Sequence, residues 1–76
     1  MNLPARYLEH EAWLYAVFAS KAALRGGIVR SDVRDVERLV GRRAFEHEVR
    51  RRGYRMVENA GQFVVFCNNE AVRVIC

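Results

Sequence analysis

Four side chains in this 76-residue sequence have the chemistry of soft metal ligands or nucleophiles: His10, His47, Cys67 and Cys76. Zinc sites use short repeated spacings such as C-x2-C or H-x3-H, and none of the four residues is paired in that way. Cys67 and His47 could form a nucleophilic pair, but the sequence marks no orienting third group and no oxyanion hole. We therefore expect ordinary histidines, structural cysteines, no metal or cofactor, and no catalysis.

The most abundant functional group in the sequence is guanidinium. Thirteen basic residues stand against nine acidic ones, which gives a formal net charge of +4, and twelve of the thirteen are arginine. A guanidinium group pairs bidentately with phosphate, carboxylate or guanine. The charge balance favours an acidic partner without showing whether that partner is nucleic acid or protein.

Length and composition limit the kind of protein that can carry these arginines. The chain is 51% hydrophobic and 29% charged, which is typical of a folded domain. We expect a single domain of residues 1–76 with a thin core, and association with a partner, because domains of this size are often marginally stable. The sequence has no disulfide framework, no signal-peptide pattern and no apolar run of about 20 residues, which indicates a cytoplasmic protein without a membrane span.

The helices that must position the arginines follow from periodicity and from helix breakers. Residues 5–25 contain no strong breaker, so one long helix is predicted there. Ser31 is a good N-cap for a second helix, which Gly41 ends. A third helix is predicted over residues 42–52, with Gly53 as its C-cap glycine.

After the third helix the pattern changes to short runs of β-branched and aromatic residues divided by turn formers. Three strands are predicted at residues 54–58, 63–67 and 71–76, with turns at 59–61 and 68–69. The middle run does not alternate with polar residues, so it should lie at the centre of the sheet or be buried on both faces. The predicted fold is α+β, with three helices followed by a small antiparallel β-meander.

The stretch SDVRDVERLVGRRAFEHEVRRRGY, with the ribbon after it, places a glycine turn between two short helices and a β-ribbon behind them. At the level of architecture, residues 31–76 resemble a winged helix-turn-helix domain. In that family the helix after the turn enters the major groove of DNA, and a hairpin wing contacts the backbone. The resemblance implies a non-catalytic DNA-binding transcriptional regulator, and a dimer is one form that such a regulator takes. The residues that it implies as contacts to nucleic acid or to another acidic partner are Arg42, Arg43, His47, Arg50, Arg51, Arg55 and Arg73.

The third helix also has a purely structural interpretation. Glu46 stands four residues before Arg50, a spacing and order that favour a salt bridge, and Glu48 and Arg52 repeat the pattern. The predicted turns of the ribbon carry no lysine or arginine, unlike a wing that grips phosphates. Arg52 lies where a cation stabilises a helix C-terminus, so Arg50 and Arg51 are the stronger candidates for partner contacts.

The predicted first helix offers a second candidate surface. Its apolar side chains cover a wider arc than a surface helix needs, so the helix is either central to the fold or covered by another chain. In the second case Trp13, Tyr15 and Phe18 are candidate interface residues, because aromatic side chains often anchor protein recognition. The chain could then be a homodimer in which this helix pairs with its copy.

An alternative function follows from size and general character. A small basic chain with a wide apolar helix is similar to small phage-encoded inhibitors such as anti-CRISPR proteins and RNA polymerase inhibitors. Those proteins share no fold or motif, so the similarity implies no site residues. It implies only that the chain would bind a larger host protein complex and block its activity. Nucleic-acid binding is the leading hypothesis, and inhibition of a host complex is the alternative.

Overall fold

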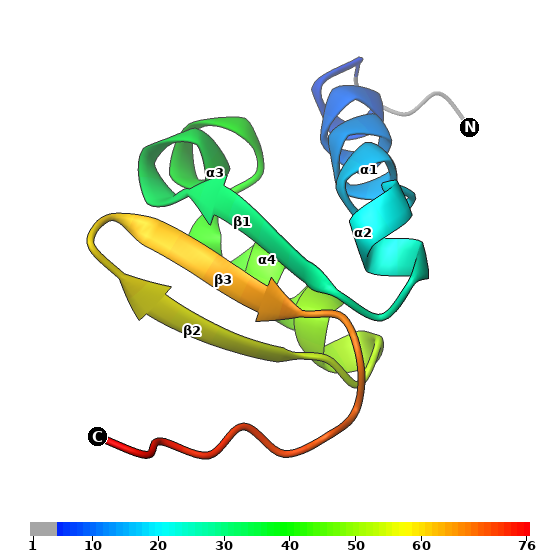
Figure 1. Cartoon of the computed structure of the whole chain (residues 1–76). Coiled ribbons are helices and arrows are strands. Elements are labelled where there is room, and N and C mark those ends of the chain that lie inside the picture. The colour runs from blue at the N-terminus through cyan, green and yellow to red at the C-terminus, as the bar shows by residue number, and fades with distance from the viewer. Residues whose placement is uncertain (1–4) are drawn as a thin grey trace.

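The computed structural model describes residues 5–76, and the side chains from Glu9 onward. In this part of the chain, the helices are α1 (Ala5–Phe18), α2 (Lys21–Leu24), α3 (Val33–Leu39) and α4 (Arg42–Arg51), and the strands are β1 (Ile28–Asp32), β2 (Arg55–Asn59) and β3 (Gln62–Phe66) (Figure 1). The predicted α+β class is confirmed. The described residues form four helices and a three-stranded antiparallel sheet.

The single helix predicted over residues 5–25 is wrong, because the chain breaks at Ser20 into α1 and α2. The Ser20 hydroxyl donates a hydrogen bond to the carbonyl of Val17 (2.9 Å) and accepts one from the N–H of Ala23 (3.3 Å). Serine competes in this way with the helix ladder, and it favours the N-cap over the helix interior. Ser20 therefore ends one helix and begins the next.

The central strand of the sheet is β3, with β1 on one side and β2 on the other, both antiparallel to it. The central place predicted for the middle run is thus confirmed. The predicted meander is wrong, because the third strand is β1, which precedes α3, and residues 71–76 form no strand. Sequence reasoning missed β1 because Ser31 and Asp32, its last two residues, also suit the start of a helix.

The β2–β3 hairpin closes through Ala60 and Gly61, whose φ angles are 50° and 76°. Positive φ at both central residues matches the twist of the flanking strands. The N–H of Val33, at the start of α3, donates a 2.9 Å hydrogen bond to the carbonyl of Gly61. The tip of the hairpin is therefore fixed to the beginning of α3.

The N-cap of α3 is Asp32 rather than the predicted Ser31. Its carboxylate accepts hydrogen bonds from the N–H groups of Arg34 (2.8 Å) and Asp35 (3.4 Å). Ser31 lies in β1, opposite Phe63 of β3. The helix begins one residue later than predicted because a carboxylate is available at the next position.

Glycines limit α4 at both ends, as predicted. Gly41, between α3 and α4, has a φ of 87°, a left-handed conformation that only glycine adopts at little cost. At the other end the N–H of Gly53 donates a hydrogen bond to the carbonyl of Arg50 (2.9 Å), and the N–H of Tyr54 donates one to the carbonyl of Val49 (3.1 Å). This bond pair is a Schellman motif, which turns the chain from α4 into β2.

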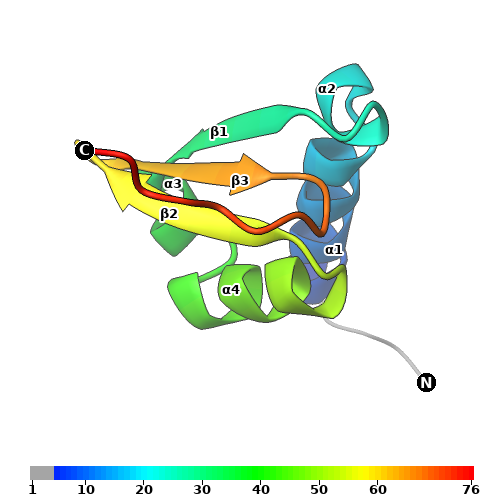
Figure 2. The same ribbon diagram turned by 60° about the horizontal axis from the view of Figure 1, so that its bottom comes forward.

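α3 and α4 lie beneath one face of the sheet, and α1 and α2 stand at its end (Figure 2). Phe45 of α4 is fully buried at the centre of the core. Its ring lies 6.0 Å from that of Trp13, 5.9 Å from that of Phe18 and 5.7 Å from that of Phe63, measured between centroids. Leu14 joins them in the core, so the wide apolar arc of α1 is largely explained by packing within the chain.

Candidate nucleic-acid interface

The outer side of α4 carries Arg43, His47 and Arg50, which we call the α4 ridge. These positions are spaced i, i+4 and i+7, so they lie along one face of the helix, and all three side chains are exposed. Among the described residues, neither Arg43 nor Arg50 forms a salt bridge. The first eight residues contain no aspartate or glutamate that could pair with them. Within the described chain the ridge therefore carries two exposed arginines that form no salt bridge.

Arg42 begins α4 but faces the hairpin. Its Nη2 donates to Glu58 of β2 at 2.6 Å and its Nε donates to Glu46 at 3.3 Å, while the guanidinium lies 5.1 Å from the ring centroid of Phe63. The bond to Glu58 is the main cause that raises the pKa of Arg42. Arg42 thus connects α4 to the sheet. The predicted salt bridge between Glu46 and Arg50 is wrong, because Glu46 pairs with Arg42 instead.

Glu48 holds the last two arginines of the helix region. It accepts hydrogen bonds from Arg51 at 2.6 Å and 3.1 Å and from Arg52 at 2.8 Å, and these two cations, Arg51 first, lower the pKa of Glu48. The guanidinium of Arg52 also lies 4.7 Å from the ring centroid of Phe18. The predicted Glu48 to Arg52 pair is confirmed. Arg51, a predicted partner contact, is engaged by a carboxylate within its own helix.

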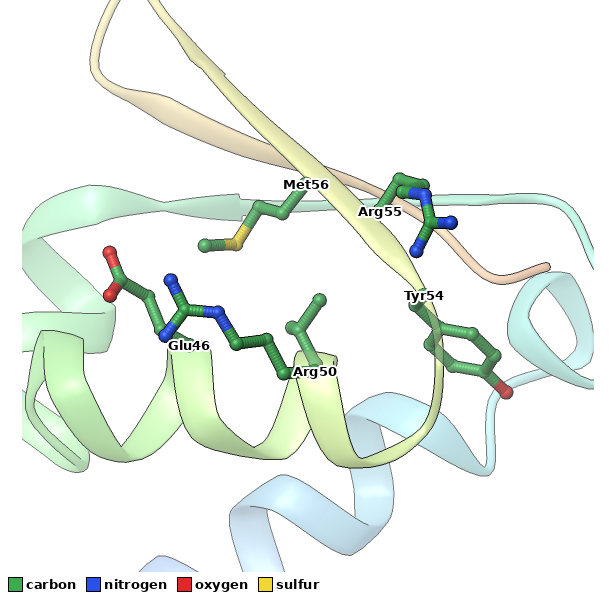
Figure 3. A pocket seen from close by; sticks show the side chains of 6 residues that line it. Glu46, Arg50, Tyr54, Arg55 and Met56 are labelled. Carbon is green, nitrogen blue, oxygen red and sulfur yellow. The ribbon is translucent and has the colours of Figure 1, made fainter. Parts of the chain in front are cut away.

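A groove of about 320 Å³ separates α4 from β2 (Figure 3). Val49, Tyr54 and Met56 form its apolar lining, and Glu46, Arg50 and Arg55 contribute charged groups. Figure 3 shows the side chains of Glu46, Arg50 and Met56 extending into the space between the helix and the strand. We call this the α4–β2 groove. It brings together Arg50 and Arg55, two of the predicted contact residues.

The remaining predicted contacts lie apart from the α4 ridge. Arg73 is exposed on residues 71–76, the extended segment that follows the sheet. The hairpin tip consists of Asn59, Ala60, Gly61 and Gln62, so it has no basic side chain, as the sequence suggested. The structure therefore gathers Arg43, His47 and Arg50 on α4, places Arg55 on β2 at the border of the groove, and leaves Arg73 on a separate element.

The three aromatic residues proposed as an interface on α1 have different environments. Phe18 is only 3% exposed and belongs to the core. Trp13 is half-buried and packs against it, whereas Tyr15 is 72% exposed. Of the three, Tyr15 is the side chain that a partner could contact most extensively.

The cysteines and histidines are not gathered into a reactive centre in the described part of the chain. No group of three histidine, cysteine, aspartate or glutamate residues is placed there to hold a metal ion. Cys67 is buried, and burial raises the pKa of its thiol, which favours the protonated and poorly nucleophilic form. His47, its proposed partner, is exposed on α4.

Comparison with protein-family models, curated proteins and solved structures finds no match for this chain. Within residues 5–76, no helix has the length and apolar character required to cross a membrane.

One further exposed arginine, Arg30, was not singled out from the sequence, and it lies on the face of the sheet opposite to Met56 and Glu58. It lies on β1 opposite Val64, and the alternation of strand residues places it on the same face of the sheet as Arg55. No local signal could have found it, because its position depends on the pairing of β1 with β3.

Proposed function

We propose that this chain is a small, non-catalytic nucleic-acid-binding protein of winged-helix-like architecture. In this proposal α4 enters the major groove of DNA and the β2–β3 hairpin is the wing. The element order supports it, because a strand precedes two helices joined by a short glycine turn and a hairpin follows them. The observation that carries the proposal is the exposed α4 ridge of Arg43, His47 and Arg50, whose two arginines form no salt bridge with any described residue.

The dimensions of the ridge suit this role. Arg50 lies seven positions after Arg43, which corresponds to about 10.5 Å along the helix axis. The major groove is about 12 Å wide and admits an α-helix, and a guanidinium group can donate to guanine O6 and N7 or to a phosphate. His47, between them, can donate to the same kinds of acceptor.

The other arginines of α4 support the ridge by fixing the helix. Arg42 ties the start of α4 to Glu58 of β2, and Arg52 stacks over Phe18 of α1 while it pairs with Glu48. These contacts connect α4 to the sheet at one end and to α1 at the other. A rigid helix is favourable for recognition because less conformational freedom is lost on binding.

The wing in this proposal acts without charge at its tip. Its four tip residues are neutral, and Glu58 beside them is held by Arg42. Phosphate oxygens accept hydrogen bonds from backbone N–H groups and side-chain amides, and not only from cationic side chains. Asn59 and Gln62 supply two such amides. The α4 ridge, with Arg55 at its side, would supply most of the charge-dependent affinity.

The test is fluorescence anisotropy of a labelled duplex DNA, titrated with protein between about 50 mM and about 200 mM salt. Each phosphate neutralised by a cation contributes about 0.9 to the slope of log K against log salt. We expect Arg43→Gln/Arg50→Gln to weaken binding and to reduce that slope by up to about 1.8, depending on how many of the two contact phosphates rather than bases. The matched control, Arg25→Gln/Arg38→Gln, removes the same charge from exposed positions on α3 and after α2.

Equal losses in the two double variants would overturn the proposal, because they would show a dependence on net charge alone. Absence of DNA binding at low salt would also overturn it. The alternative would then be a protein that binds and inhibits a larger host complex, of the anti-CRISPR or RNA polymerase inhibitor kind. The exposed Tyr15 would be its first contact to test.

A further inference from the structure

Residues 71–76 have the composition of a strand but no strand partner. Val74 and Ile75 are 85% and 86% exposed, and Val72 is 40% exposed. In the described chain no backbone hydrogen bond joins this segment to the sheet. Figures 1 and 2 show it as an extended chain that passes close to β2. The segment therefore leaves both its aliphatic side chains and its backbone groups unsatisfied by the rest of the fold.

The outer edge of β2 is also unpaired. The N–H of Cys67 donates to the carbonyl of Gly27, and the N–H of Val33 donates to the carbonyl of Gly61. Because Gly61 and Cys67 flank β3 at odd-numbered positions, the backbone groups of the odd-numbered residues of β3 face β1. The even-numbered residues of β3 then bond to β2, which leaves the backbone groups of Met56 and Glu58 facing the open edge. An exposed edge of this kind can accept an added strand.

We infer that residues 72–76 of a second copy of this chain add to the open edge of β2 as an antiparallel strand, and that the exchange is reciprocal. The lengths match, because β2 has five residues and five residues from Val72 to Cys76 can pair with them. A two-fold arrangement satisfies both copies at once, since each supplies one strand and accepts one. The inference does not rest on the proposed function, because it concerns self-association alone.

Charge and apolar character select the register. With Val74 of the second copy opposite Val57, its Arg73 lies opposite Glu58 and its Ile75 opposite Met56. Successive residues alternate between the faces of a sheet, so these two side chains share the face of Met56 and Glu58, toward α4.

In this register the second copy's Ile75 enters the α4–β2 groove. The groove offers Val49, Tyr54 and Met56 as apolar contacts, and its volume of about 320 Å³ leaves space for an aliphatic side chain. The second copy's Arg73 reaches the carboxylate of Glu58, which is 43% exposed beside Arg42. A slip of one residue would instead turn Arg73 toward Val57 on the opposite face, so this register is the complementary one.

A second copy fits the edge better than the chain's own segment does. The side-chain amide of Asn68 donates to the carbonyl of Gly26 (3.0 Å), which fixes the start of the segment beside the residue pair that leads into β1. From there the segment runs in the same direction as β2 (Figure 1), so within one chain only a parallel pairing is available. Antiparallel pairing is slightly more stable per residue, and a separate copy can approach in that direction.

Sedimentation velocity over a range of protein concentrations tests the association. We expect the wild-type chain to form a dimer and Ile75→Asp to weaken the dimer about tenfold or more, because a carboxylate would replace the side chain in the groove. Leu24→Asp is the matched control, since Leu24 is 75% exposed on α2 and has no place in the proposed interface. A monomeric wild-type chain at the highest concentration, or equal effects of the two variants, would overturn the inference.

Disulfide trapping tests the register directly. In the proposed register, Val74 of the second copy and Val57 form a non-hydrogen-bonded pair. Their Cα atoms are then about 4.5 Å apart, within the range that a disulfide can bridge. Affinity-tagged Val57→Cys chain is mixed with untagged Val74→Cys chain, both carrying Cys76→Ser, and we expect a mixed disulfide-linked dimer. Val72→Cys in place of Val74→Cys should trap far less, because that residue lies diagonally opposite at about 7 Å or more. Equal trapping at both positions, or none at either, would contradict the proposed pairing.

Discussion

Replacement of Phe45 by alanine should remove a large part of the stability of this domain. The ring is fully buried, and it connects α1 to the sheet through its contacts with Phe18 and Phe63. Loss of a buried phenylalanine side chain typically costs about 3–5 kcal/mol, from the transfer of the ring and from the cavity that remains. A domain of 76 residues, at about 0.05–0.15 kcal/mol per residue, has a free energy of unfolding of about 4–11 kcal/mol. The variant should therefore lose at least about a quarter of its stability.

Urea unfolding monitored by circular dichroism measures this loss as a fall in the midpoint at an unchanged slope. Tyr15→Ala is the control, because it truncates an aromatic side chain on α1 that is 72% exposed. We expect that change to stay within about 0.5 kcal/mol. A cost for Phe45→Ala below about 1.5 kcal/mol, or one no larger than that of Tyr15→Ala, would refute a core built around this ring.

Three further predictions concern single residues. The lowered pKa of Glu48 means that its ionised form stabilises the fold at pH values above the pKa of the unfolded chain, and that this stability is lost as pH falls through the folded value. Glu48→Gln should therefore flatten the loss of stability on acidification below the usual range of a glutamate, and an unchanged acid profile would argue against it. Gly41→Ala should cost about 1 kcal/mol in thermal or urea unfolding, because φ is 87° while no atom obstructs the new methyl group, and a neutral effect would contradict that assignment of strain. A thiol reagent should label Cys76 at once in the native protein, but Cys67 only after unfolding, because Cys67 is buried. Mass spectrometry of timed samples measures both rates, and rapid labelling of both cysteines in the native protein would contradict the burial of Cys67.

The elements that local signals define were predictable from the sequence. α4 lies between two glycines of positive φ, and Gly61 supplies one of the two positive φ angles in the turn of the β2–β3 hairpin. The break at Ser20 and the choice of β1 as the third strand were not predictable in the same way. Two short runs, residues 28–32 and residues 71–76, could each pair with β3, and only the packed fold decides between them.

The candidate site shows the same division. The exposure of Arg43 and Arg50 follows from helical periodicity around Phe45 and Val49, which face the core. The use of Arg42 within the fold does not, because its partner Glu58 lies on β2, sixteen positions along the chain. The sequence could therefore indicate a basic helix, but it could not show which of its arginines are occupied by internal contacts.

The pairing of β1 with β3 also determines when the chain can fold. Ile28 stands opposite Phe66, so the two strands meet only after both helices of the α3–α4 pair and the whole of β2 have been synthesised between them. Contacts between residues distant in sequence slow folding, because a long loop must close before any bond rewards it. On the ribosome the aromatic contacts between α1 and α4 can form once α4 is free, but the side of this core that faces the sheet stays uncovered until β3 emerges. We therefore expect the sheet, and with it the complete core, to form only after β3 has been made.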